Sequence, residues 1–157
     1  MYPHPAALLF RLLLSLCGIG FAVGFPLAYG LKESYSQYFA VDPVAFCCTL
    51  ALLSVGLFMH KNPRWLIPAC SLMLVAAFDM FSMPLIHYSA AFIFFVFSSV
   101  AMYDDKRIGG FGKTSFALYP LLIFDLIYFE FIQVILLCLF HIFYIIKTFM
   151  LMVRKNS

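Results

Sequence analysis

The sequence predicts an all-α protein. We expect residues 1–157 to form a single transmembrane domain, a polytopic bundle of about six membrane-spanning helices with both termini in the cytoplasm. Hydrophobic residues make up 65% of the chain, charged residues 11%, and the mean hydropathy is +1.02, whereas soluble chains are nearer half apolar and a quarter charged. Residues 114–153 are mostly Phe, Ile, Leu and Tyr. As one helix they would be about 60 Å long, roughly twice the hydrocarbon thickness of a bilayer, so they should fold back as a hairpin.

The first predicted span covers residues 6–29. It has Arg11 near its start and small residues at its end, as a signal peptide does, but its apolar run is longer than that of a typical signal peptide. We therefore expect it to remain as a helix. Gly20 and Gly24 form a GxxxG pattern, which lets helices approach closely, and this pattern favours packing inside the protein over dimerisation.

The next three spans are separated by short polar connections. Pro43 and Pro84 each open an apolar run, and proline suits the first turn of a helix. Pro26, Pro68 and Pro120 lie inside spans, where they should kink or end helices. The predicted ranges are 43–59, 65–81 and 84–103.

The long apolar segment supplies the last two spans, predicted at 114–127 and 131–153. The fifth has about fourteen residues and would be about 21 Å long, which is short for a full crossing. Two arrangements stay open for it: an upright segment in a deformed bilayer, or a re-entrant segment.

The basic residues support six spans, because they then fall on one side. That side holds Arg11, His60, Lys61, Arg64, Lys106, Arg107, Lys113, Arg154 and Lys155, and the other holds Lys32, Glu33 and Asp42. Cytoplasmic loops carry the excess of Lys and Arg, so both termini are predicted to be cytoplasmic. The bases are scattered, so nucleic acid is not an expected partner; membrane lipids and other membrane subunits are. The short loops favour a bacterial inner membrane.

Ionisable residues inside a membrane are costly and are the first functional candidates. A polar cluster is predicted in the outer leaflet. The turn at residues 82–83 would place Asp79 and His87 at equal depth, which predicts a hydrogen bond between them. A turn near residues 128–129 would place Asp125 level with Gln133, and Glu130 shares a helix face with Gln133 at i,i+3.

Three interpretations of this cluster stay open. Its members cap and cross-link helices, or they bind a lipid head group or a cation, or they form an acid–base site for which no nucleophile is identified. His141, in the middle of the last span, either bonds to a neighbouring helix or joins Asp125, Gln133 and Lys147 in a proton path. The five cysteines show no zinc-binding spacing, so no metal or cofactor is expected.

Residues 83–95, MPLIHYSAAFIFF, are followed by Asp104, Asp105, Lys106 and Arg107. This stretch of about twenty residues resembles one helix of a six-span family that contains the damage-regulated autophagy modulators and the GPI-anchor lipid-remodelling factors. In that family an outer-side His opens a helix with small residues and a paired Phe. The resemblance implies a role in lipid handling or membrane organisation, with His87 as a head-group or structural residue. The first outer loop is shorter than the family's and lacks its extended polar pattern.

Three functions follow from these observations. The first is a non-catalytic role, as an accessory subunit or membrane organiser in a larger assembly, which the thin loops and the incomplete catalytic set favour. The second is a lipid-handling or lipid-modifying protein built on Asp79, His87, Asp125 and Glu130. The third is a proton- or ion-coupled carrier that uses His141.

Overall fold

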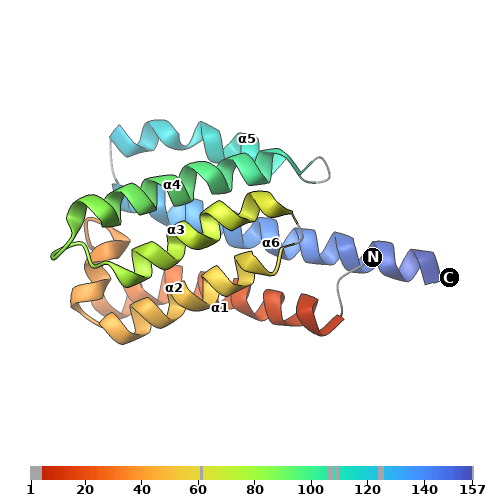
Figure 1. Cartoon of the computed structure of the whole chain (residues 1–157), viewed down its shortest axis with the longest axis horizontal. Coiled ribbons are helices and arrows are strands. Elements are labelled where there is room, and N and C mark those ends of the chain that lie inside the picture. The colour runs from red at the N-terminus through yellow and green to blue at the C-terminus, as the bar shows by residue number, and fades with distance from the viewer. Residues whose placement is uncertain (1–4, 61, 106–107, 109, 124–125, 157) are drawn as a thin grey trace.

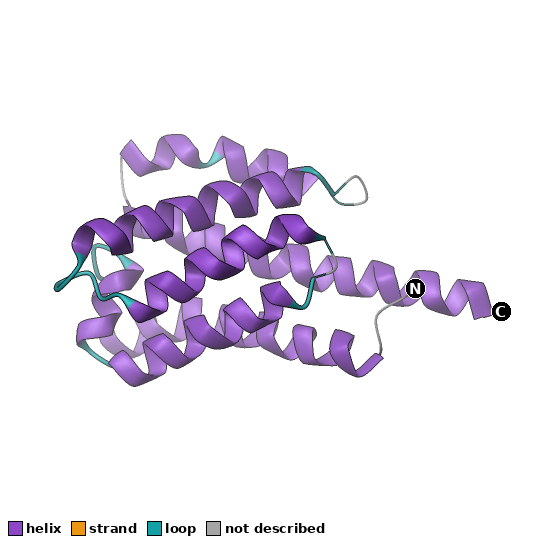
Figure 2. Cartoon of the chain, viewed as in Figure 1, coloured by secondary structure: helices purple, strands orange, loops and turns teal. Residues whose placement is uncertain are grey.

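The computed structural model describes residues 5–60, 62–105, 108, 110–123 and 126–156, and all regular structure in these ranges is helical (Figures 1 and 2). The predicted all-α class is therefore confirmed. The α-helices are α1 (Pro5–Tyr29), α2 (Pro43–Phe58), α3 (Leu66–Ala77), α4 (Pro84–Tyr103), α5 (Gly110–Ala117) and α6 (Leu126–Asn156), and the 3₁₀ helices are η1 (Tyr35–Ala40), η2 (Pro63–Trp65) and η3 (Tyr119–Ile123).

Three of these helices are long and apolar enough to cross a membrane. They lie in α1, α4 and α6, at Ala6–Tyr29, Pro84–Tyr103 and Leu126–Arg154, while Pro43–Phe58 and Pro63–Ala77 are shorter apolar helices. Large apolar side chains such as Leu27, Leu85 and Phe92 stand exposed on the outside. This composition is compatible with a multi-pass integral membrane protein.

Helices that follow one another in the chain pack side by side, and α6 returns to pack along α1. The start of α1 and the end of α6 lie at the same end of the bundle (Figure 1). We call this the η2 end, because η2 lies there, and the opposite end, which holds η1 and the turn at residues 78–83, the η1 end. The core runs between them and is built from Phe21, Phe46, Leu72, Phe94, Phe140 and their buried neighbours.

The helix boundaries are set by local caps. Asp42 closes the start of α2, because its Oδ1 accepts a hydrogen bond from the Ala45 N–H at 2.9 Å and Pro43 needs no partner in the first turn. The predicted span 84–103 agrees with α4. The prediction that the third span reaches residue 81 was wrong: α3 ends at Ala77, and residues 78–83 form a turn held by Asp79.

The bounds predicted for the fifth span, 114–127, also differ from those in the structure. Helix α5 begins at Gly110 and ends at Ala117, and η3, which contains Pro120, continues the segment. Proline lacks the N–H that a regular helix needs in its interior, which fits the change from α-helix to 3₁₀ helix. The predicted turn at 128–129 lies inside α6, which begins at Leu126.

Close helix contacts occur at glycines other than those predicted. Nothing lies within 4 Å of a Cβ built at Gly20 or Gly24, so their predicted packing role was wrong. Instead, a Cβ at Gly18 would be 2.7 Å from Cys138 Sγ on α6. At Gly112 a Cβ would be 2.2 Å from the backbone nitrogen of Tyr103, so α5 packs directly against the end of α4 there.

Candidate functional site

Asp79 and His87 lie on either side of one turn, but they do not pair. Asp79 Oδ1 accepts hydrogen bonds from the N–H groups of Phe81 at 2.9 Å and Ser82 at 2.7 Å. The hydrogen bond from the Ser82 backbone lowers the pKa of Asp79 below its ordinary value. The predicted Asp79–His87 hydrogen bond was wrong because the short turn offers this carboxylate its own backbone N–H groups.

His87 is instead bonded to Ser36 and Phe78. Its Nδ1 lies 2.6 Å from the Phe78 carbonyl oxygen, and its Nε2 lies 2.6 Å from Ser36 Oγ. A carbonyl only accepts, so Nδ1 carries the proton, and in the tautomer protonated at Nδ1 the Nε2 atom accepts from the serine hydroxyl. The side chain of His87 is 1% exposed. It therefore fastens η1 to the end of α3.

Glu130, on α6, also contacts η1. Its Oε2 accepts from the Tyr35 N–H at 2.6 Å, and the Tyr35 hydroxyl donates to the Ala22 carbonyl. Burial raises the pKa of the Tyr35 phenol above its ordinary value, which keeps that donor protonated. Glu130 and Gln133, which were predicted to share a helix face, have different hydrogen-bond partners.

Gln133 binds α5. Its Oε1 accepts from Ser115 Oγ at 2.6 Å, and its Nε2 donates to the Ser115 carbonyl at 2.9 Å. Ser115 Oγ also lies 2.5 Å from Ser99 Oγ on α4, so the network joins α4, α5 and α6. Asp125, predicted to stand level with Gln133, lies outside the described residues.

At the η2 end, His141 is hydrogen-bonded to a neighbouring helix. This agrees with the first of the two interpretations given for it above. Its Nδ1 lies 3.4 Å from Arg11 Nη2 on α1 and 3.1 Å from His60 Nε2, just after α2. Arg11 is 4% exposed and its guanidinium lies 5.1 Å from the centre of the Tyr144 ring. The three residues therefore form a buried basic cluster, which we call the Arg11–His141 cluster. Of the residues predicted to form a proton path, Gln133 and His141 have separate hydrogen-bond partners, and Asp125 lies outside the described residues.

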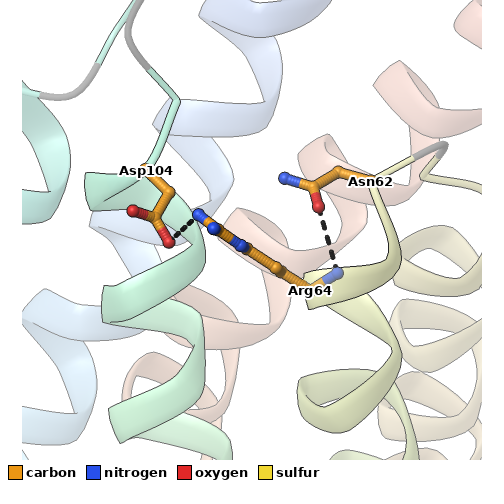
Figure 3. Close-up of polar contacts among 3 residues, drawn as sticks. All are labelled: Asn62, Arg64 and Asp104. Carbon is orange, nitrogen blue, oxygen red and sulfur yellow. Dashed lines mark hydrogen bonds and ion pairs between the residues drawn. The ribbon is translucent and has the colours of Figure 1, made fainter.

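Aromatic side chains enclose this cluster. The His60 ring stacks on Trp65 with centroids 4.9 Å apart, and Trp65 lies 4.7 Å from His141. Trp65 ends η2, and Asn62 caps η2 by accepting from the Arg64 N–H at 3.1 Å. The Arg64 side chain also forms an ion pair with Asp104 at the end of α4 (Figure 3). These contacts position Trp65 over the histidines.

The interior of the bundle contains two adjoining cavities. The first, about 60 Å³, begins at Arg11, Ser15 and His141, and the second, about 50 Å³, ends at Tyr35, Ser36 and Glu130. Five apolar residues line both: Phe21, Leu50, Leu72, Phe94 and Val134. By the same kind of measure a single water needs about 10–15 Å³, so these are narrow spaces that suit a thin, linear occupant.

An apolar groove on the outer surface lies beside the second cavity. It has a volume of about 340 Å³ and runs between α1 and α6 at the η1 end, where Leu27, Leu31 and Tyr128 are exposed. Tyr35 lines both the groove and the second cavity. Of the residues that line the outer groove, Tyr35 alone also lines the second cavity.

Sequence reasoning missed several of these groups. It counted Arg11 and His60 as loop charges on the cytoplasmic side, whereas both are buried. A pattern could have marked Arg11, since it is the single charge inside the apolar run 6–29. No pattern marks Ser36 or Tyr35, because the η1 connection brings them inward only through its fold.

Searches of protein-family models, curated proteins and solved structures found no match for this chain. Within the described ranges, no three His, Cys, Asp or Glu side chains come together as metal ligands. The described contacts therefore carry the argument about function.

Proposed function

We propose that this chain is a lipid-handling membrane protein that takes one acyl chain from the bilayer into the interior of its helix bundle. The observation that carries this is the pair of adjoining apolar cavities, which share Phe21, Leu50, Leu72, Phe94 and Val134. The surrounding bilayer consists of acyl chains, and the outer groove brings such a chain next to the second cavity at Tyr35. Narrow apolar cavities exclude rings and bulky head groups but fit a single linear chain.

The chain in this proposal crosses the bilayer six times, with both termini on the cytoplasmic side. Successive helices run in opposite directions between the η1 and η2 ends, which supports this topology (Figure 1). The placement of the basic residues supports it too, since Arg64 in η2 and Lys113 in α5 belong to the η2 end. The segment made of α5 and η3 is the fifth crossing, and Gln133 joins it to α6.

A photolabelling experiment tests chain uptake. The whole protein is placed in nanodiscs with a long-chain fatty alcohol that carries a photoreactive diazirine, and labelled residues are mapped by mass spectrometry. We expect label on interior residues such as Leu50 and Leu72 in addition to lipid-facing residues such as Leu85. Label confined to lipid-facing residues would contradict the proposal.

A matched pair of variants sharpens this test. Val134→Phe places an aromatic ring where the two cavities adjoin. Val153→Phe makes the same change at a side chain on α6 that is 53% exposed. We expect Val134→Phe to reduce interior labelling about tenfold, which corresponds to a lost binding free energy of about 1.4 kcal/mol. Val153→Phe should leave the interior labelling unchanged.

The accessory role predicted from the sequence is tested by the same preparation. A partner protein that co-purifies in fixed stoichiometry, together with no interior label, would favour an accessory subunit over lipid handling. A co-purifying single-chain lipid, detected by mass spectrometry of the extract, would favour uptake.

A further inference from the structure

Arg11 is a buried charge without a described counter-charge. It is 4% exposed, and no carboxylate in the described ranges forms an ion pair with it. Its contacts are with His141 Nδ1 at 3.4 Å and with the ring of Tyr144. A guanidinium stays charged at any physiological pH, and a buried charge is costly unless it is paired.

His141 adds an unused donor beside this charge. Arginine only donates, so His141 Nδ1 accepts and the neutral ring carries its proton on Nε2. That Nε2 is buried and has no hydrogen-bond partner in the structure. A buried polar atom without a partner is uncommon in a folded protein and calls for an explanation.

Both residues border the same space. Arg11 and His141 line the first cavity, whose other lining residues are almost all apolar. A charge-assisted hydrogen bond in such surroundings is stronger than one in water. A positive charge and a free N–H at one end of an apolar cavity are complementary to an anionic group attached to an apolar chain.

We propose that the Arg11–His141 cluster binds the carboxylate of a long-chain fatty acid, with the tail lying in the two cavities. This inference rests on the proposed uptake of an acyl chain and names the head group. One carboxylate oxygen accepts from Arg11 and the other from His141 Nε2. Two donors and a small cavity fit two oxygens, whereas a phosphate monoester brings a third oxygen and a larger head.

The dimensions along α6 agree with this orientation. His141 lines one end of the cavities and Glu130 the other, and eleven residues of α-helix separate them by about 16 Å. At the far end Ser36 Oγ contacts His87, and Glu130, itself an acidic side chain, accepts from the Tyr35 N–H through Oε2. The basic end therefore takes the head group, and the tail points toward Tyr35 and the outer groove.

Competition against the photoreactive fatty alcohol tests the head group. Unlabelled fatty acid, fatty alcohol and alkyl phosphate of equal chain length compete for interior labelling at a pH where the fatty acid is ionised. We expect the fatty acid to compete about tenfold better than the alcohol, as one or two charge-assisted hydrogen bonds would give. Equal competition by acid and alcohol would overturn the inference, and better competition by the alkyl phosphate would replace the carboxylate with a phosphate.

Variants of the basic residue complete the test. Arg11→Gln should abolish the preference for the acid while the alcohol probe still labels the interior, and Arg11→Lys should keep part of it. Lys113→Gln, which removes an exposed charge in α5, should keep the full preference. An acid preference that survives in Arg11→Gln would contradict the assignment.

Two kinds of failure are distinguishable. Absence of interior label from the alcohol probe defeats chain uptake, and with it the fatty-acid site. Interior label without charge preference defeats only the fatty-acid site. The wild-type comparison of acid and alcohol decides even if Arg11→Gln does not fold.

Discussion

The hydrogen bond between Ser36 and His87 shows how one buried residue can hold a connection in place. His87 Nδ1 is committed to the Phe78 carbonyl, so Nε2 depends on Ser36 for its only described partner. If Ser36 is removed, a buried nitrogen loses its hydrogen bond. The cost of an unsatisfied buried acceptor is about 1–3 kcal/mol.

We therefore expect Ser36→Ala to lower the free energy of unfolding by about that amount, measured by thermal or denaturant unfolding in detergent. Ser54 is the matched control, because it is also buried but its hydroxyl has no hydrogen-bond partner among the described residues. Ser54→Ala should change stability little. Equal losses in the two variants would mean that the Ser36–His87 bond contributes nothing specific.

Residue types alone selected His87, Glu130, Gln133 and His141 as candidates, and all four are buried and hydrogen-bonded in the structure. Their partners were not predictable. Ser36, Tyr35 and Ser115 are ordinary loop or helix residues in the sequence, and only the packing of η1 and α5 brings them inward. The partner predicted for Asp79 was wrong because backbone N–H groups two and three residues away are nearer to its carboxylate than a side chain across the hairpin.

At the scale of the element, α5 depends on its contacts with the helices on either side of it in the chain. It is only eight residues long, too short to be stable as an isolated helix. It is held by the Ser115–Gln133 bonds and by the contact of Gly112 with the Tyr103 backbone.

We expect Gly112→Ala to destabilise the protein by about 1–3 kcal/mol or more, because backbone atoms rather than a flexible side chain occupy the space of the new methyl group. Gly110, in the same helix, has nothing within 4 Å of a Cβ. Gly110→Ala should be neutral or slightly stabilising, since alanine favours helix. Thermal unfolding of the two variants in detergent compares them, and similar midpoints would argue against the close contact.

Element existence was easier to predict than element ends. The apolar runs that begin at Pro43 and Pro84 gave α2 and α4 with correct starts, because proline fixes the first turn. The predicted boundary between the last two spans was wrong because residues 114–153 are mostly apolar. Hydropathy alone therefore does not indicate where one helix ends and the next begins. Two segments on opposite sides of that break are told apart only by their packing.

At the scale of the whole molecule, the proposed topology predicts which connections meet the cytoplasm. Glu33 is exposed at the η1 end, and Lys113 is exposed near the η2 end. In a background without reactive native cysteines, Glu33→Cys should react with a membrane-impermeant maleimide added outside intact cells. Lys113→Cys should react only after permeabilisation. Labelling of both from outside would contradict six crossings with cytoplasmic termini.

The lengths of α2 and α3 have a consequence for the membrane itself. Helix α2 has 16 residues, and η2 with α3 extends over Pro63–Ala77, so each is about 24 Å long. The hydrocarbon layer is about 30 Å thick, and these two helices pack side by side on one flank of the bundle. Such hydrophobic mismatch has a modest energetic cost for each ångström. The protein should therefore partition into the thinner of two coexisting membranes, and the lipids along that flank should be less ordered than those along α4.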